Sequence, residues 1–341
     1  MSNHKHSTIN KWRFFLFPLA VVYQLIMVCR NLFYNIGFFV TRSLPAAVIS
    51  IGNITTGGTG KTPTVIAMAN WLKDEGFSVA ILSRGYGRTT SGTVIVTDGN
   101  TIEKTWQEVG DEPAMMAKLT DSIPIVVDEN RYRGSMFLYK QTKPDIIILD
   151  DAFQHRAIAR DIDLVLVSAG DSVQDHKLLP HGNLREPWNH IKRADAILAS
   201  KSNLFDPKPF LVAQLKRTPV PSYKTEFTSI LKHHHGNPEE SPFVMVCALG
   251  DPHSFRSALD HQDITISYEM TYSDHYQYTQ NDIEQMQKSI SHYSANGIVC
   301  TDKDWIKLAS LEIPFSVYVL SIEIILPDDL KTFISDRLPK S

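Results

Sequence analysis

Cysteine is scarce in this chain of 341 residues, and neither sign of charge dominates it. The three cysteines, Cys29, Cys247 and Cys300, are odd in number and scattered, which argues against a disulfide framework and fits a reducing compartment. They also lack the paired spacing of a zinc site. The formal net charge of −3 gives no bulk attraction to nucleic acid, which usually needs a basic face. The chain has no internal repeat, and the sequence predicts no protein partner.

The N-terminal region is unusually apolar. An apolar run covers residues 14–29, Arg30 and Asn31 interrupt it, and a second run follows. Lys11 and Arg13 would suit a secretory signal, but no convincing small-residue cleavage site follows. The first run is also shorter than the ~20 residues that span hydrocarbon. We expect a helix in the membrane interface, with Lys11, Arg13 and Arg30 near the headgroups; a spanning helix and an internally packed helix are the alternatives.

Beyond residue 46, short β-branched runs alternate with helical stretches. Helices are expected over Lys61 to Asp74 and around Arg131 to Lys140. The stretches at 145–151 (DIIILDD) and 163–169 (DLVLVSA) are nearly continuous apolar runs, as strands covered on both faces should be. Strands separated by helices of this length indicate βαβ units and a parallel sheet.

A polar, proline-rich segment over 206–242 is interpreted as a connection, after which a second α/β section begins. That section begins with FVMVCALGDPHSF at 243–255, and further strands are expected within 297–305 and 317–324. The three histidines at 233–235 are interpreted as part of a solvated loop. Consecutive residues seldom converge on one ion, so we do not expect a metal there.

The stretch TTGGTGKT at residues 55–62 resembles a phosphate-binding loop. The usual pattern is G-x-x-x-x-G-K-[ST], and Thr55 stands here in place of the first glycine. Glycines let successive backbone N–H groups turn inward on phosphate oxygens. Lys61 would then reach the β- and γ-phosphates, and the Thr62 hydroxyl would ligate magnesium. A ligand-free turn is the alternative, but the strand before the loop and the helix after it favour a bound nucleotide. The residues predicted to bind it are Thr55, Thr56, Gly57, Gly58, Thr59, Gly60, Lys61 and Thr62.

Two adjacent carboxylates, Asp150 and Asp151, end the apolar strand at 145–151. They emerge at the edge where open parallel sheets bind ligands. We expect Asp150 to hold the magnesium shared with Thr62, while Asp151 supports it or contacts the substrate side. Carboxylates that cap a strand or helix end are the alternative.

Six motifs occur along the chain in a specific order. They are SIGNITTGGTGKTP, SRGYGR, VGDEP, DDAFQHR, LLPHGNLREP and TDKDWIKL. Together they resemble the tetraacyldisaccharide 4'-kinase family, the lipid A 4'-kinases, over nearly the whole chain. The resemblance implies an α/β fold with a P-loop NTPase-type parallel sheet, a second, smaller α/β domain and an N-terminal membrane-associated helix. The expected parts are a helical region at 1–42, a P-loop kinase domain at 43–224 and a C-terminal α/β domain at 225–341.

This resemblance also implies a reaction. The family transfers the γ-phosphate of ATP, with Mg²⁺, to the 4'-hydroxyl of a tetraacylated glucosamine disaccharide 1-phosphate. The implied location is the cytoplasmic face of the inner membrane of a Gram-negative bacterium, so the expected partners are the acylated lipid and the membrane surface.

Individual roles follow from the matching motifs. Asp111 in GDEP matches the catalytic aspartate, and His275 in YSDHYQY matches a histidine that pairs with it from the second domain. Without the resemblance, Asp111 would be interpreted as a helix cap and His275 as a surface histidine. Asp302 and Lys303 in TDKDW receive no role. The residues expected around the substrate are Arg84, Arg131, Arg185 and Glu186, since guanidinium groups meet phosphate oxygens bidentately.

Two other classes of protein are the alternatives. Membrane-targeted, partition-type regulatory ATPases share a G-G-x-G-K-T loop but carry a lysine just before the two glycines, where this chain has Thr56. A small-molecule synthetase of the dethiobiotin type would leave the apolar N-terminal helix unexplained. The GDEP and LREP motifs further favour the lipid kinase.

Overall fold

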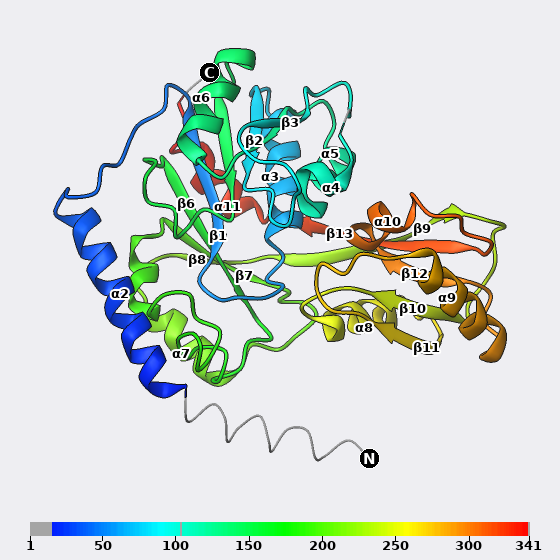
Figure 1. Cartoon of the computed structure of the whole chain (residues 1–341). Helices are drawn as coiled ribbons and strands as arrows, with labels where there is room; N and C mark the ends of the chain where they lie inside the picture. The colour runs from blue at the N-terminus through cyan, green and yellow to red at the C-terminus, as the bar shows by residue number, and fades with distance from the viewer. Residues whose placement is uncertain (1–15, 103, 340–341) are drawn as a thin grey trace. The chain divides into compact units, whose positions relative to one another are not determined.

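The computed structural model describes residues 16–102 and 104–339, and the chain forms two compact units (Figure 1). The first unit consists of Met1–Lys61, Asp151–Thr225 and Pro327–Ser341, and the second of Thr62–Asp150 and Glu226–Leu326. These divisions differ from the predicted domains 43–224 and 225–341, whose bounds stay a prediction. Lys11 and Arg13, expected near lipid headgroups, lie outside the described residues.

Four parallel strands form the sheet of the first unit, in the order β1-β6-β7-β8. Their bounds are β1 Ala47–Asn53, β6 Ile162–Ser168, β7 Ala196–Ser200 and β8 Ser222–Lys224. Strands β6 and β7 are buried along their whole length, which agrees with the continuous apolar runs in their sequence. The helical elements of this unit are α2 Phe17–Asn35, η1 Trp188–Arg193, α7 Pro209–Arg217 and α11 Asp328–Ser335.

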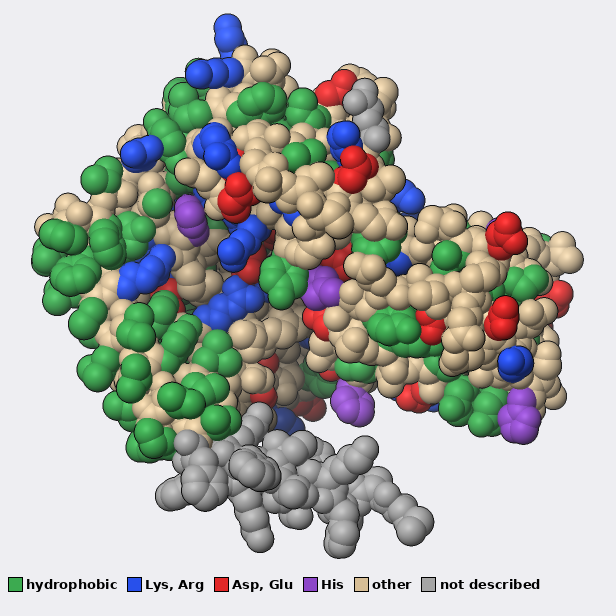
Figure 2. All heavy atoms as spheres, viewed as in Figure 1, with side chains coloured by type: hydrophobic (Ala, Val, Ile, Leu, Met, Phe, Trp, Pro, Cys, Tyr) green, Lys and Arg blue, Asp and Glu red, His purple; other side chains and the backbone are tan. Residues whose placement is uncertain are grey.

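Helix α2 lies along the outside of the first unit (Figure 1). Its buried residues, Ala20, Met27 and Asn31, form one narrow stripe at helical spacing. Hydrophobic side chains gather over the exposed remainder in Figure 2, and the large ones are Phe17, Leu19, Val21, Val22, Leu25, Ile26, Val28, Leu32 and Phe33. Among the described residues, α2 is the one helix that is long and apolar enough to cross a membrane by length and composition. The expectation for Arg30 was wrong, because its Nη2 donates to the Gln154 carbonyl at 2.6 Å and the side chain thus faces the protein.

The second unit contains a four-stranded stretch in the order β3-β4-β2-β5. Strands β4, β2 and β5 pair in parallel, and β3 pairs antiparallel to β4 at the edge. The strand bounds are β2 Val79–Ser83, β3 Val94–Thr97, β4 Ile125–Val127 and β5 Ile146–Asp150. The accompanying helices are α3 Lys61–Asp74, α4 Trp106–Val109, α5 Asp111–Leu119 and α6 Arg131–Thr142. Helix α3 therefore has the predicted bounds, and its first residue is the last one of the first unit.

A five-stranded sheet completes the second unit, in the order β11-β10-β12-β13-β9. Its bounds are β9 Glu226–His235, β10 Phe243–Cys247, β11 Ile266–Thr271, β12 Ile298–Thr301 and β13 Val317–Ile325. Helices α8 Pro252–His261 and α9 Gln280–His292 and the short helix α10 Asp302–Leu308 accompany it. Because side chains alternate across a strand, Val244 and Val246 of β10 pack with α9, while Met245 and Cys247 pack with α8.

The interpretation of 206–242 as a connection was wrong. The segment contains α7, β8 and β9. Strand β9 pairs antiparallel with β13 from Glu226 to His235, so the three histidines belong to an edge strand. Polar composition misled the prediction because an edge strand exposes most of its side chains. Among residues 16–102 and 104–339, no group of three or more His, Cys, Asp or Glu side chains is placed to hold a metal ion.

Candidate functional site

The glycine-rich loop follows β1 in the first unit and leads into α3. Gly57 and Gly60 have φ values of 120° and 82°, which a glycine adopts without the strain of a side chain. Hydrogen bonds fix the loop between them, since the Asn53 amide donates to Thr59 Oγ1 at 3.1 Å and the Ser200 hydroxyl donates to the Thr59 carbonyl at 2.7 Å. The loop is therefore held from both sides in a conformation in which its amides can meet an anion.

Other contacts tie the same loop to the segment that precedes η1. The backbone N–H of Thr56 donates to the Asn183 carbonyl at 2.7 Å, and that of Arg185 donates to the Ile54 carbonyl at 2.8 Å. Close packing also requires Gly52, because a Cβ there would lie 2.6 Å from the Phe153 nitrogen. The chain that follows β5 is thus pressed against the end of β1.

Three charged side chains of the first unit converge beside this loop. Arg185 Nη1 lies 2.9 Å from both carboxylate oxygens of Asp151, and Lys61 Nζ lies 3.8 Å from Asp151 Oδ1. All three are partly exposed, with side-chain accessibilities of 26% for Arg185, 33% for Asp151 and 13% for Lys61. Two cations and one anion leave an excess of positive charge, which suits a ligand that carries phosphates.

In the second unit, Thr62 and Asp150 are buried, with exposed fractions of 7% and 2%. Asp150 Oδ2 accepts a hydrogen bond from the Ser83 hydroxyl at 2.7 Å. A hydroxyl and a carboxylate are oxygen donors of the kind that Mg²⁺ prefers, and Mg²⁺ usually takes only one or two carboxylates from a protein. The donor set therefore fits the expected metal, with Asp150 the better placed of the two aspartates because Asp151 is paired with Arg185 and Lys61.

Asp111 is the first residue of α5, and the backbone before it forces its position. Gly110 has a φ of 98°, and a Cβ there would lie 2.9 Å from the Tyr86 carbonyl. Gly110, not Asp111, occupies the N-cap position, although Asp111 Oδ1 accepts the backbone N–H of Glu112 at 2.9 Å. The carboxylate turns inward and is only 5% exposed.

His275 meets this carboxylate within the second unit. Its Nδ1 lies 3.0 Å from Asp111 Oδ2 and 3.2 Å from Oδ1, although the two residues are 164 positions apart in sequence. His275 has a φ of 60°, and its ring lies 5.1 Å from that of Tyr86. The structure thus brings together the two residues that the family resemblance paired, while their catalytic role stays a prediction.

Two lysines of α10 complete the surroundings of Asp111. Lys307 Nζ lies 3.1 Å from Asp111 Oδ2, and Lys303 Nζ lies 3.8 Å from the same oxygen. Burial by itself would raise the pKa of Asp111, but the hydrogen bond from His275 and the charges of Lys303 and Lys307 together hold it well below its usual range. The carboxylate is therefore charged at any physiological pH.

The arginines expected around the substrate lie in different surroundings. Arg84 is exposed. Arg88, which lies with Arg84 in the SRGYGR motif, is bound to Glu129 and to the Gly92 carbonyl. Arg131 is only 4% exposed and donates to the carbonyl groups of Asp128 and Asp150 at 2.8 and 3.4 Å. Arg131 therefore supports the end of β5 from within, and its contact with the substrate stays a prediction.

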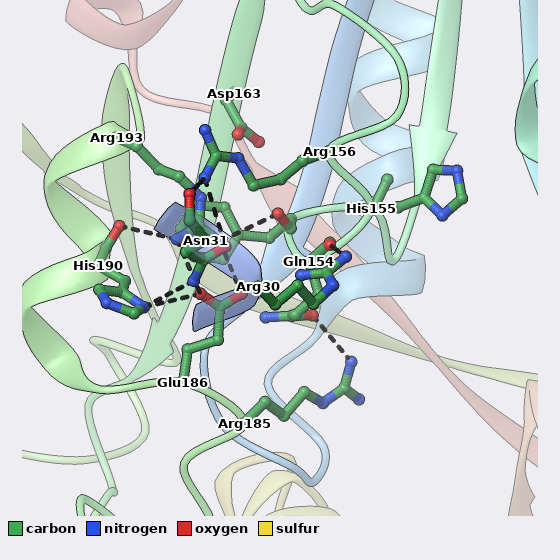
Figure 3. Close-up of polar contacts among 12 residues, drawn as sticks. Arg30, Asn31, Gln154, His155, Arg156, Asp163, Arg185, Glu186, His190 and Arg193 are labelled. Carbon is green, nitrogen blue, oxygen red and sulfur yellow. Dashed lines mark hydrogen bonds and ion pairs between the residues drawn. The ribbon is translucent and has the colours of Figure 1, made fainter. Parts of the chain in front are cut away.

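Glu186 is fully buried and bound to protein groups (Figure 3). Its carboxylate accepts hydrogen bonds from Arg193 at 2.7 and 2.9 Å and from the Asn31 amide at 2.7 Å, and it lies 3.0 Å from His190 Nδ1. Burial would raise the pKa of Glu186, but the contacts with His190 and Arg193 lower it to about 2. These partners hold α2 against the rest of the first unit, and the predicted contact of Glu186 with the substrate stays a prediction.

Comparisons with known proteins agree on one family. The family profile described as LpxK, tetraacyldisaccharide-1-P 4'-kinase, matches residues 12–339. The chain belongs to this family. The 4'-kinase of Aquifex aeolicus is 36% identical over 89% of the chain and 92% of its own length, and that of Chlorobaculum parvum is 38% identical over 87% and 84%.

A solved structure confirms the fold class of this tetraacyldisaccharide 4'-kinase family member. The chain aligns with a crystal structure of the "apo" form of LpxK from Aquifex aeolicus in complex with ATP, with a TM-score of 0.78 and 33% identity. The alignment covers 96% of this chain and all of the other. The partition-type ATPase and the dethiobiotin-type synthetase are not favoured by any of these comparisons.

Sequence reasoning missed Lys307 and left Lys303 without a role. Both lie in the motif TDKDWIKL, and their spacing of four residues places them on one face of a helix. That spacing was a usable signal, but nothing in the local sequence indicates that the face with both lysines lies next to the distant Asp111.

Proposed function

We propose that this protein is the ATP-dependent kinase that phosphorylates the 4'-hydroxyl of a tetraacylated glucosamine disaccharide 1-phosphate. The observation that carries the proposal is the pairing of the buried Asp111 with the partly exposed His275 in a member of the 4'-kinase family. A sugar hydroxyl is a weak nucleophile, and phosphoryl transfer needs a group that orients it and receives its proton.

On the nucleotide side, the loop amides from Gly57 to Gly60 hold the phosphates of ATP. Lys61 and Arg185 place positive charge beside this loop, where charge develops on the transferred phosphoryl group. Thr62 and Asp150 would hold Mg²⁺, which would supply positive charge to neutralise the phosphates. Positioning and electrostatics of this kind supply most of the catalysis in phosphoryl transfer.

On the acceptor side, Asp111 orients the sugar hydroxyl by accepting its hydrogen bond. The low pKa of Asp111 makes it a constant hydrogen-bond acceptor, and a loose transition state needs little proton transfer before the new P–O bond forms. The proton leaves late, into the Asp111–His275 pair.

The protein works at a membrane surface, because its substrate carries acyl chains. The exposed apolar side of α2 supports this placement, since a contiguous patch of this kind marks a membrane or protein contact. The polar side of the helix is hydrogen-bonded to the protein, with the Tyr23 hydroxyl donating to the Arg185 carbonyl at 2.7 Å. We propose that the helix lies in the interface at the cytoplasmic face of the inner membrane, and its exposed apolar side and the family membership support this placement.

The direct test is incubation with γ-labelled ATP, Mg²⁺ and the acylated disaccharide 1-phosphate, followed by separation of the lipids. We expect label in a bisphosphorylated lipid, and we expect Asp111→Ala to lose turnover while ATP binding is largely kept. Label that appears only as inorganic phosphate, with or without lipid, would favour the regulatory ATPase instead.

A further inference from the structure

Two lysines on α10 approach Asp111, and the proposed reaction gives neither of them a role. Lys307 is the more buried, with a side-chain exposure of 0%. Its Nζ lies 3.1 Å from Asp111 Oδ2 and also donates to the Tyr276 carbonyl at 3.1 Å. A fully enclosed ammonium group cannot reach a substrate, so Lys307 can influence the reaction only through the groups it touches.

The contacts on Asp111 fix both of its carboxylate oxygens. Oδ2 faces His275 Nδ1 at 3.0 Å, Lys307 Nζ at 3.1 Å and Lys303 Nζ at 3.8 Å. Oδ1 accepts the backbone N–H of Glu112 at 2.9 Å. Donors on both oxygens prevent the carboxylate from rotating about χ2, a torsion that is otherwise broad in aspartate.

Burial of these charges has a cost that an apolar residue would avoid. Replacing a buried ion pair by apolar residues often leaves the stability of a protein unchanged or increases it. Stability of the fold alone therefore does not explain why a lysine is buried at position 307. A second cation, Lys303, approaches the same oxygen while binding Asp274 Oδ1 at 3.0 Å and lying 3.6 Å from Glu112 Oε1. The arrangement therefore concentrates positive charge on one carboxylate oxygen.

We propose that Lys307, assisted by Lys303, is a positioning residue that locks the Asp111 carboxylate in the orientation that receives the substrate hydroxyl. This inference rests on the proposed function. In the transfer, the hydroxyl oxygen forms a bond to the γ-phosphorus, the bond from that phosphorus to the bridging oxygen of ADP breaks, and the hydroxyl proton passes to the Asp111–His275 pair. The lysines exchange no atoms and act through Asp111 alone.

A role of this kind has a pH signature. The ionisable groups that face Asp111 are His275 from the loop after β11, Lys303 and Lys307 from α10, and Glu112 from α5, with Asp274 held by Lys303. Removal of the Lys307 charge raises the pKa of Asp111, because one of the groups that lower it is lost. The acidic limb of the kcat/KM profile should then move to higher pH.

The experiment is a double-mutant cycle between Lys307→Met and Asp111→Asn in the full chain, with kcat, both KM values and melting temperature measured. We expect Lys307→Met to lower kcat about 10²-fold, as a small misplacement of a catalytic group does, with KM for ATP within about twofold of the unmutated protein. In the Asp111→Asn background it should cause no further loss of kcat. Lys73→Met is the matched control, since Lys73 pairs with the exposed Asp121, and its kcat should not change.

An unchanged kcat and pH profile for a folded Lys307→Met protein would overturn the proposal, and so would an equal loss of kcat in both backgrounds. If Lys307→Met does not fold, the partly accessible Lys303→Met enters the same cycle. A smaller loss that disappears with Asp111→Asn then supports the proposal, and no loss overturns it. If the unmutated protein itself transfers no phosphate to the lipid, the proposed function fails instead.

Discussion

The substitution Asp111→Asn tests whether the charge of the Asp111 carboxylate is needed for catalysis, because it removes one charge and keeps the shape of the side chain. Lys307 is fully buried, and Asp111 is the carboxylate 3.1 Å from it. Breaking a buried pair by removing one partner costs about 3–5 kcal/mol. Asparagine still offers an oxygen to Lys307, so we expect the lower end, about 3 kcal/mol, and a fall in Tm of about 6–12 °C.

The same change should affect turnover much more than nucleotide binding. A lost orienting group in phosphoryl transfer costs about 10²–10³ in kcat. The ATP affinity should be nearly unchanged, because the loop amides up to Gly60, Lys61 and Arg185 belong to the first unit and Asp111 belongs to the second. Label transfer to the lipid measures kcat, titration calorimetry measures ATP affinity and scanning calorimetry measures Tm.

Asp121→Asn is the matched control. This carboxylate is 89% exposed and pairs with Lys73 at the surface, so both kcat and Tm should stay close to those of the unmutated protein. Normal turnover of the Asp111→Asn protein, or a loss of ATP affinity as large as the loss of kcat, would contradict the role proposed for Asp111. Adding Lys307→Met to Asp111→Asn should recover part of the lost Tm, because it removes the buried cation that Asn leaves without a counter-charge.

Three further changes probe other parts of the molecule. Lys61→Met should lower kcat by about 10²–10³ and weaken ATP binding, whereas Lys331→Met on α11 should leave label transfer intact. Glu186→Gln should cost about 2 kcal/mol of stability at pH 7. The folded-state pKa of Glu186 is lowered from 4.5 to about 2. The difference in Tm between the unmutated and the mutant protein should therefore persist above about pH 4.5 and vanish as pH falls toward 2. A difference that grows in acid would contradict this assignment. Leu25→Glu on the exposed side of α2 should reduce sedimentation with liposomes while the Tm changes little, and unchanged sedimentation would show that this side of the helix does not meet lipid.

Local patterns predicted the parts of the fold that depend on local sequence. Helix α3 has the expected bounds Lys61–Asp74, because a strand, a glycine loop and a good helix sequence follow one another without interruption. Strand β9 was missed, because its extended conformation depends on pairing with β13, which lies far along the chain. Edge strands carry polar side chains and resemble loops in composition.

In the site, too, features that depend on local sequence could be predicted and those that depend on distant residues could not. The phosphate loop is readable from a single stretch, whereas Asp111 and His275 are 164 residues apart and could be paired only through the resemblance to a family. Glu186 and Arg131, which we expect at the substrate, are both buried, and their burial could not be predicted because a charged residue in a motif gives no sign of how deeply it lies. Lys307 stayed unnoticed for a related reason, since the burial of a lysine depends on a distant carboxylate.

The most direct test of the central claim is a crystal structure with a non-hydrolysable ATP analogue and the acylated disaccharide 1-phosphate bound together. We predict that the 4'-hydroxyl lies within hydrogen-bond distance of the Asp111 carboxylate and faces the γ-phosphorus of the nucleotide in the loop. A closed complex in which Asp111 points away from that hydroxyl, while another side chain holds it, would contradict the proposed mechanism.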